Sequence, residues 1–375
     1  MLSATGRTQT NSLRYLEIMF DQLIGNDNVK SLLRRMLEAK RLPGAMLFVG
    51  EEGVGKKLFA LEIAKALNCR KPRGVEGCGK CAACKRISKF NYPQSAESDD
   101  WKKIIWTDHP DVGMVVAPKR VLIVEQMRAV ENAANYRPFE GAARVFIVED
   151  ADKLNDSSAN ALLKILEEPP HTSFIILLTS RPAQLLPTIR SRCQMIRFSP
   201  LAAEEIENYL TQNKIAAGKD ARMLARVSRG SIGRAQSQDS EKFTSQRESM
   251  MKVLKALAAG NDHIQLLRSA EELNEARHKD EFEVRLDILE TLIRDAWMLA
   301  LDAPSSKVVN EDLLPQLTRV SERLDRHRPG GWISRIEEMR EQFIVNINRK
   351  SATDSLFLTM ATATGLPPKR RFLIK

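Results

Sequence analysis

The sequence predicts an α/β domain built on a parallel sheet around a phosphate-binding loop, followed by a small helical domain and an all-helical C-terminal domain. Short continuous apolar runs alternate with helical stretches up to Pro200, which is the pattern of strands buried on both faces. A glycine-rich stretch, GEEGVGKK, directly follows the first of these runs. After Pro200 the strand-like runs stop and amphipathic helical periodicity takes over.

Each element follows from its local pattern. The expected strands are the apolar runs at 45–49, 111–116, 144–149, 174–179 and 194–198, and the expected helices of this region are 57–67, 122–133 and 157–167. The polar part of segment 91–119 predicts an insertion loop, which Trp101 and Trp106 would anchor by packing. Farther along lie a long amphipathic run from His263 to Leu301 and a Pro/Gly break at 329–331.

These patterns predict the domain boundaries. Residues 1–19 form a polar extension, 20–199 a nucleotide-binding-type domain, 200–240 a small helical domain, and 241–375 a helical C-terminal domain. The chain has no apolar run as long as a membrane span, and its first residues lack the apolar core of a signal peptide. We therefore expect a cytoplasmic protein without a membrane partner.

The charge balance favours a polyanionic partner. The formal net charge is +10 and the hydrophobic content is 43%, as in an ordinary globular protein with a basic surface. Part of the excess lies in Lys369, Arg370 and Arg371. For that run a solvated tail and a DNA contact remain equal alternatives.

The glycine-rich loop predicts phosphate binding. Gly50, Gly53 and Gly55 let backbone N–H groups turn towards phosphate oxygens, and Lys56 can reach the β- and γ-phosphates. Lys57 stands where the motif normally has a Ser or Thr that ligates Mg²⁺, and an ammonium repels that ion. The loop therefore predicts ATP binding with doubtful Mg²⁺-dependent hydrolysis. The alternative is a glycine-rich turn without a ligand.

Acidic residues stand at the end of the run at 144–149 and directly after it. Glu149 and Asp150 are placed to anchor Mg²⁺ and polarise water, but the usual order of such a pair is Asp then Glu. Asp152 fits the cap of the next helix. Thr179 would either touch a γ-phosphate or cap its strand, and Arg234 could bring a second cation over the nucleotide.

Arg192, in Ser191-Arg192-Cys193, has the rigid fork that suits a γ-phosphate, and such an arginine finger can be supplied in trans. A surface salt bridge is the alternative role for any single arginine.

Four cysteines have the spacing of a metal site: Cys69-x8-Cys78-x2-Cys81-x2-Cys84. Four thiolates suit tetrahedral zinc in a structural role. An iron–sulfur run would place its fourth cysteine at position 88, which is Ser88. Four unliganded thiols are the remaining alternative, and Cys193 is expected to be a core thiol.

Several longer stretches, in order along the chain, carry a resemblance. They are FDQLIGN (20–26), LPGAMLFVGEEGVGK (42–56), HPDV (109–112), ANALLKILEEPP (159–170), FIILLTSRP (174–182), IRSRC (189–193) and GSIGRA (230–235). Together they resemble the AAA+ clamp-loader family of bacterial DNA polymerase III.

The resemblance implies an AAA+ module whose helical lid is residues 200–240, followed by an oligomerising collar at 241–375. It implies a hetero-pentamer with gamma/tau-type motor subunits and a delta subunit, which opens a sliding clamp and closes it on primed DNA without reading its sequence. In that scheme Arg192 is a finger for a neighbour, whereas Lys56, Glu149, Thr179 and Arg234 belong to this chain's own ATP site.

Three departures from the motor subunits decide the type of subunit expected. Lys57 and the Glu149-Asp150 order both affect the catalytic metal, and the long C-terminal extension of motor subunits is missing. We therefore expect a non-hydrolysing subunit. The alternatives are an active motor ATPase and a zinc-dependent nucleic-acid binder.

Overall fold

The computed structural model describes residues 20–95, 98–118, 121–275, 281–343 and 348–362. The polar extension 1–19 and the basic run at 369–371 lie outside these ranges. The chain divides into two compact units, one of residues 1–217 and 228–237, the other of residues 218–227 and 238–375. The segment predicted as a lid, 200–240, contributes helices to both units.

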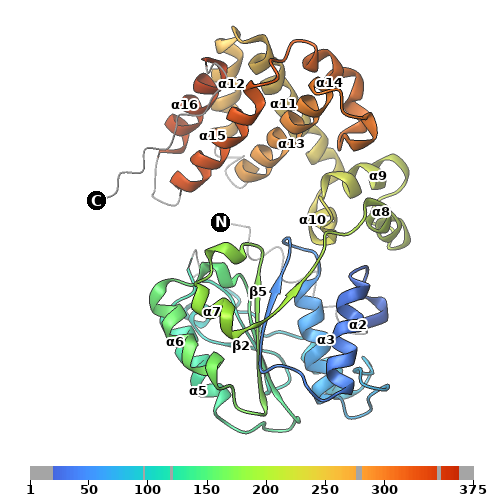
Figure 1. The fold of residues 1–375 in the computed structure, drawn as a ribbon, viewed down its shortest axis with the longest axis vertical. Helices are drawn as coiled ribbons and strands as arrows, with labels where there is room; N and C mark the ends of the chain where they lie inside the picture. The colour runs from blue at the N-terminus through green and yellow to red at the C-terminus, as the bar shows by residue number, and fades with distance from the viewer. Residues whose placement is uncertain (1–19, 96–97, 119–120, 276–280, 344–347, 363–375) are drawn as a thin grey trace. The chain divides into compact units, whose positions relative to one another are not determined.

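The first unit contains a six-stranded sheet in the order β2-β3-β4-β5-β1-β6 (Figure 1). Its strands are β1 Ala45–Val49, β2 Ile105–Trp106, β3 Val112–Val115, β4 Arg144–Val148, β5 Ser173–Thr179 and β6 Gln194–Arg197. All neighbours pair in parallel except β2, which is antiparallel to β3. The parallel sheet is thus confirmed, and the short edge strand β2 is an addition within the predicted insertion.

Helices cover both faces of this sheet (Figure 1). One face carries α2 Asp27–Glu38 and α3 Lys56–Asn68, and the other carries α5 Val124–Ala134, α6 Asp156–Glu167 and α7 Pro187–Arg192. Helix α4 Ala82–Ile87 packs on α3. The unit also contains α8 Ala203–Gln212 and α10 Ile232–Ser237. Because both faces are covered, β1 and β4 are buried along their whole length, which explains their continuous apolar sequences.

The insertion is anchored by a tryptophan, as predicted. Trp101 is buried, and its Nε1 donates to the carbonyl of Ser95 at 2.8 Å. Gln126 of α5 donates in turn to the Trp101 carbonyl at 2.8 Å. Trp106, in β2, packs against the core with its ring centroid 6.0 Å from that of Phe146. The insertion is therefore fastened to the sheet.

The second unit is all-helical. Its helices are α9 Gly218–Val227, α11 Ser240–Ala259, α12 His263–Asn274, α13 Phe282–Ala300, α14 Leu314–Ser321, α15 Arg328–Phe343 and α16 Arg349–Thr362. The amphipathic run 263–301 forms two helices, because Glu275 turns to an extended conformation with ψ 145° after α12. Residues 329–331 of the predicted Pro/Gly break lie in the first turn of α15, where proline needs no amide hydrogen.

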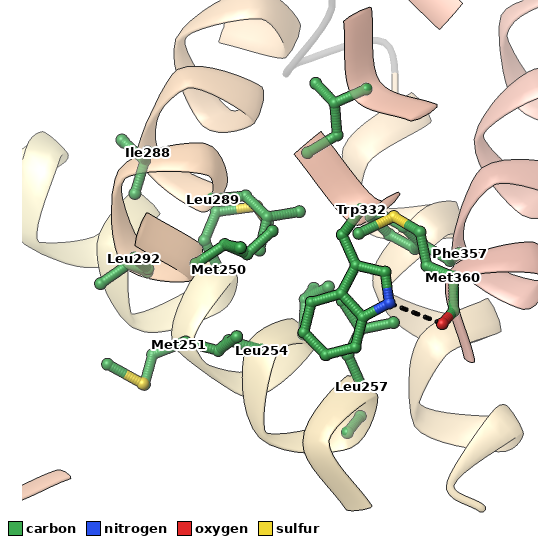
Figure 2. Packing of buried hydrophobic residues seen from close by; sticks show 14 of the residues in the cluster. Met250, Met251, Leu254, Leu257, Ile288, Leu289, Leu292, Trp332, Phe357 and Met360 are labelled. Atoms are coloured by element: carbon green, nitrogen blue, oxygen red, sulfur yellow. Dashed lines mark hydrogen bonds between the residues drawn. The ribbon is translucent and has the colours of Figure 1, made fainter. Parts of the chain in front are cut away.

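The core of this unit gathers around Trp332 (Figure 2). The indole is fully buried, and its Nε1 donates to the Met360 carbonyl at 2.8 Å, which satisfies its polar group. Met250, Leu254 and Leu257 of α11 belong to the same cluster.

Short 3-10 helices complete the chain at Phe20–Gln22, Asp99–Lys102, Ala151–Lys153, Pro182–Gln184, Ser305–Lys307 and Glu311–Leu313. Among the described helices, none combines the length and the apolarity that a bilayer span requires.

Candidate nucleotide site, arginine edge and cysteine cluster

The predicted nucleotide residues meet at the carboxyl edge of the sheet. The parallel strands β1, β4 and β5 end there, so the glycine-rich loop, Glu149 and Thr179 lie side by side. The amide of Gly50 donates to the Thr179 carbonyl at 3.2 Å. The sheet therefore brings together residues far apart in the sequence, as the motif predicts.

The loop packs directly against the start of α10. Gly53 and Gly55 have φ of 75° and 105°, values that favour glycine. The amide of Gly233 donates to the Gly53 carbonyl at 3.0 Å. A Cβ on Gly53 would lie 2.3 Å from Ser231 Oγ, and one on Gly233 would lie 2.9 Å from Gly53 Cα. Two glycines are thus needed where the backbones touch.

Arg234 follows this contact. Its Nη2 lies 3.8 Å from Glu51 Oε2 in the loop. The arginine is therefore close to the phosphate loop, as expected, where it faces an acidic side chain.

Lys56 folds back onto the loop. Its Nζ donates to the carbonyls of Gly50 at 2.6 Å and Glu51 at 2.8 Å. Burial lowers the pKa of this lysine, although nearby acids, Asp150 first, act in the opposite direction. The ammonium group is held inside the loop, which it must leave if it is to reach a phosphate.

Lys57 is fixed in a small cage of aromatic and acidic groups. Its Nζ lies 3.4 Å from Glu149 Oε2 and donates to the Tyr92 hydroxyl at 3.0 Å. It also lies 5.3 Å and 5.6 Å from the ring centroids of Phe90 and Tyr92, within cation–π range. The ammonium therefore neutralises the acid expected to serve Mg²⁺. The two aromatic residues were not predicted; the sequence signal for them is the Phe90-x-Tyr92 pair at the start of the insertion.

The neighbouring polar residues are also paired. Asp150, with φ of 51°, forms an ion pair with Lys153 at 2.8 Å. Thr179 is buried, and its hydroxyl donates to Asp152 Oδ1 at 2.6 Å. The expectation that Asp152 caps the next helix is wrong, because Asn155 is the N-cap of α6 and accepts from Ser158 N at 2.9 Å.

Arg192 lies at the amino ends of the parallel strands, opposite the carboxyl ends where the predicted nucleotide residues meet. It ends α7 directly before β6, and Gln194 of β6 pairs with Met46 near the start of β1. A five-residue strand such as β1 spans about 16 Å, so Arg192 is out of reach of the loop that follows the far end of this strand. Its Nε donates to Glu167 Oε1 at 2.8 Å, and its Nη1 donates to the Thr188 carbonyl at 3.0 Å. The Arg192 side chain is about one-third exposed.

The four predicted metal ligands converge. The Sγ atoms of Cys69, Cys78, Cys81 and Cys84 all lie within 4.8 Å of one another, and those of Cys69 and Cys81 are 3.8 Å apart. A tetrahedral site with Zn–S bonds of about 2.3 Å has S···S edges of about 3.8 Å. The Cys78 amide donates to Cys69 Sγ and the Cys81 amide to Cys78 Sγ, both at 3.3 Å, as suits thiolates. The donor set fits a tetrahedral metal ion.

Cys193 stands apart in the hydrophobic core, as predicted. Burial raises the pKa of its thiol to about 12.

A buried ion pair lies within α3, the helix that leads into Cys69. Lys65 Nζ and Glu62 Oε1, both on α3, are 2.8 Å apart and almost completely buried. Burial raises the pKa of Glu62 to about 7, against the opposing effect of Lys65. Glu76, from the loop between the cysteines, pairs with Arg34 of α2. The cysteine segment is thereby tied to α2, and Cys69 itself directly follows α3.

Two family models and several known proteins resemble this chain. Residues 25–202 match the family model described as "DNA polymerase III, delta subunit", and residues 241–352 match "DNA polymerase III, delta subunit, C terminal". The DNA polymerase III subunit delta' of Bacillus subtilis is 26% identical over 332 residues, covering 88% of this chain and 95% of the relative. The Escherichia coli subunit delta' is 28% identical over 324 residues, covering 86% and 90%.

A gamma/tau subunit, from Mycoplasma genitalium, is 31% identical over 224 residues, but this match covers only 58% of the chain and 34% of the relative. Similarity to delta' subunits extends over most of both chains and includes the helical unit. The chain belongs to the delta' family of DNA polymerase III clamp-loader subunits.

Proposed function

We propose that this chain is the delta'-type subunit of a bacterial clamp loader, that it does not hydrolyse ATP itself, and that it lends Arg192 to the nucleotide site of a neighbouring motor subunit. The observation that carries the absence of ATP hydrolysis is the 3.4 Å pair between Lys57 and Glu149. Mg²⁺ binding at this acid would have to displace an ammonium held by two aromatic rings.

The trans role of Arg192 is supported by its position. It lies at the edge opposite its own phosphate loop and is partly exposed. Its bond to Glu167 can be exchanged for one to a phosphate, because an exposed ion pair contributes only about 0–1 kcal/mol. In the isolated chain Arg192 forms the salt bridge with Glu167, and in the assembled loader it would serve as the arginine finger.

The partners follow from the proposal. They are gamma/tau-type motor subunits and a delta subunit in a hetero-pentamer, together with a sliding clamp and primed DNA, in the bacterial cytoplasm near the nucleoid. Zn²⁺ is the proposed occupant of the four-cysteine cluster, in a structural role. Any ATP in the glycine-rich loop would bind without productive use of Mg²⁺.

The test is Arg192→Ala in a reconstituted loader with its partner subunits. Fingers contribute about 10³–10⁵ in rate at the site they complete, so clamp- and DNA-stimulated hydrolysis should fall to what the other sites supply. Arg181→Ala is the matched control, because this exposed arginine follows β5 at the carboxyl edge. Assembly, measured by gel filtration, should be unchanged in both variants. Unaltered hydrolysis and clamp loading in Arg192→Ala would contradict the finger.

A further inference from the structure

The cysteine cluster carries an unusual concentration of positive charge. Residues 69–89 include seven Lys or Arg and one acid, Glu76, a formal charge of +6 before the thiols are counted. Four thiolates around a divalent metal would subtract only two charges. Balancing the metal centre therefore does not account for the excess.

The cations belong to the segment whose four thiols converge. Lys71 is two residues from Cys69, and Lys80 and Lys85 each adjoin a cysteine, while the four Sγ atoms lie within 4.8 Å of one another. Lys89 follows one turn after Lys85, beyond the end of α4. All four lysines are exposed, and among the described residues none of them has an acidic partner. We call these four residues the lysine cluster.

A rigid loop with two exposed aromatic rings adjoins this cluster. Tyr136 is 67% exposed and Phe139 is 75% exposed, in the loop between α5 and β4. Glu140 connects this loop to the cysteine segment: it pairs with Arg86 of α4 and lies 3.9 Å from Arg70. The loop that carries the two aromatic rings is thus joined to the segment that carries the lysines.

The loop is held in place from below. The fully buried carboxylate of Asp111 accepts from the amides of Phe139 at 2.7 Å, Glu140 at 3.0 Å and Gly141 at 2.9 Å. Arg144, also buried, has its Cζ 5.3 Å from the centroid of the Phe139 ring. The ring is therefore supported by a cation while three-quarters of its residue faces solvent, so little conformational entropy remains to be lost on stacking.

We propose that the lysine cluster, with Tyr136 and Phe139, forms a binding surface for single-stranded DNA. Proteins that bind single strands without reading sequence combine cations along the phosphate backbone with aromatic rings on which bases stack. The cations and the exposed rings are separate observations, and both point to this ligand. The choice of DNA over RNA rests on the proposed function.

The experiment measures binding of a fluorescent oligo-dT of about 20 nucleotides by anisotropy, using the full-length, metal-loaded chain at several salt concentrations. The triple variant Lys80→Gln, Lys85→Gln, Lys89→Gln should weaken binding and lower the slope of log affinity against log salt by about 2. Its control, Lys252→Gln, Lys255→Gln, Lys307→Gln, makes the same charge change at exposed positions of the second unit and should bind like the wild type.

The aromatic half has its own arm. Tyr136→Ala with Phe139→Ala should lower affinity roughly five-fold or more while leaving the salt slope unchanged, and Phe139→Trp should retain affinity. A duplex of the same length should compete poorly because its bases are already stacked. Equal competition by the duplex, or equal loss in the two triple-lysine variants, would overturn the proposal.

One further outcome is decisive. If the aromatic variant binds oligo-dT normally but no longer assembles with loader subunits or the sliding clamp, the surface serves a protein and the proposal is wrong. These variants leave Arg192 and the glycine-rich loop intact, so such a failure is distinct from failure of the finger assignment.

Discussion

Lys57 and Glu149, 92 positions apart, form an ion pair of 3.4 Å at the carboxyl edge of the sheet. Each is partly buried, with side chains 21% and 32% exposed. Lys57 adjoins the lysine of the phosphate loop, and Glu149 follows β4. The ammonium group of Lys57 therefore lies beside the acid that a motor ATPase would use to bind Mg²⁺.

The first prediction concerns this pair. The wild-type chain should bind ADP no more tightly with Mg²⁺ than with EDTA, because Lys57 already satisfies Glu149, and the chain alone should show no ATP turnover with primed DNA. Lys57→Thr, with Glu149→Asp and Asp150→Glu, should acquire Mg²⁺-dependent binding. Calorimetric titration and steady-state hydrolysis measure both. Turnover by the wild type that is lost in Lys56→Ala would mean that this subunit is a motor.

The second prediction tests the contact between the loop and α10. Gly233→Ala places a methyl group 2.9 Å from Gly53 Cα, so we expect the free energy of unfolding to fall by about 1–3 kcal/mol. Gly331→Ala is the matched control, since its Cβ meets no atom within 4 Å and a helical alanine is favoured over glycine. Urea unfolding of the two variants measures the difference. Equal stability would show that the backbones can separate at no cost.

The third prediction concerns the metal. Cys84→Ser should lower the zinc content below one ion per chain and remove hydrogen-exchange protection from residues 69–89, because this segment depends on its ligands more than on an apolar core. The strands β1, β4 and β5 should keep their protection. Cys193→Ser is the control and should retain its zinc, since Cys193 lies outside the cluster. Loss of protection throughout the sheet would contradict a local role.

The fourth prediction is a pH dependence. The pKa of Glu62 is about 7 in the folded chain against an ordinary value of 4.5, so the folded state holds a proton that the unfolded state releases. The stability from this group is complete below pH 4.5 and is lost as pH rises through 7, by up to about 3 kcal/mol. Glu62→Gln removes this dependence.

Urea unfolding at pH 5.5 and pH 8 should therefore show the stability difference, variant minus wild type, shifting in favour of Glu62→Gln at the higher pH. Because both chains carry the same cysteines and histidines, other titrations cancel in this difference. A difference that does not change with pH would mean that Lys65 keeps Glu62 ionised throughout.

Local sequence patterns predicted the parallel sheet well. Continuous apolar runs mark strands buried on both faces, and β1 occupies the expected residues while the other predicted strands differ by one residue at one or both ends. Strand β2 was missed because two residues, Ile105 and Trp106, are too few to show a period. Its conformation depends on pairing with β3.

The candidate site was predicted as a set of residues, but its pairings were not. The motif identified Lys57 as an obstacle to Mg²⁺, whereas its partner Glu149 and its aromatic neighbours become adjacent only when β4 and the insertion fold against the loop. Likewise, the spacing of the cysteines predicted a tetrahedral cluster. The HPDV stretch contains Asp111, but nothing in it indicated that this carboxylate would hold the loop that carries Phe139.

The position of Arg192 before β6, opposite the loop after β1, gives the subunit a direction. In an open row of subunits, in which each arginine completes the nucleotide site of the next subunit, the member at one end donates an arginine and need not receive one. A chain with an intact donor edge and a neutralised acceptor site can fill that place without wasting a hydrolytic cycle. In such a row the place of this subunit would be set by its parallel sheet, because the carboxyl ends of the strands carry the glycine-rich loop and the amino ends carry Arg192.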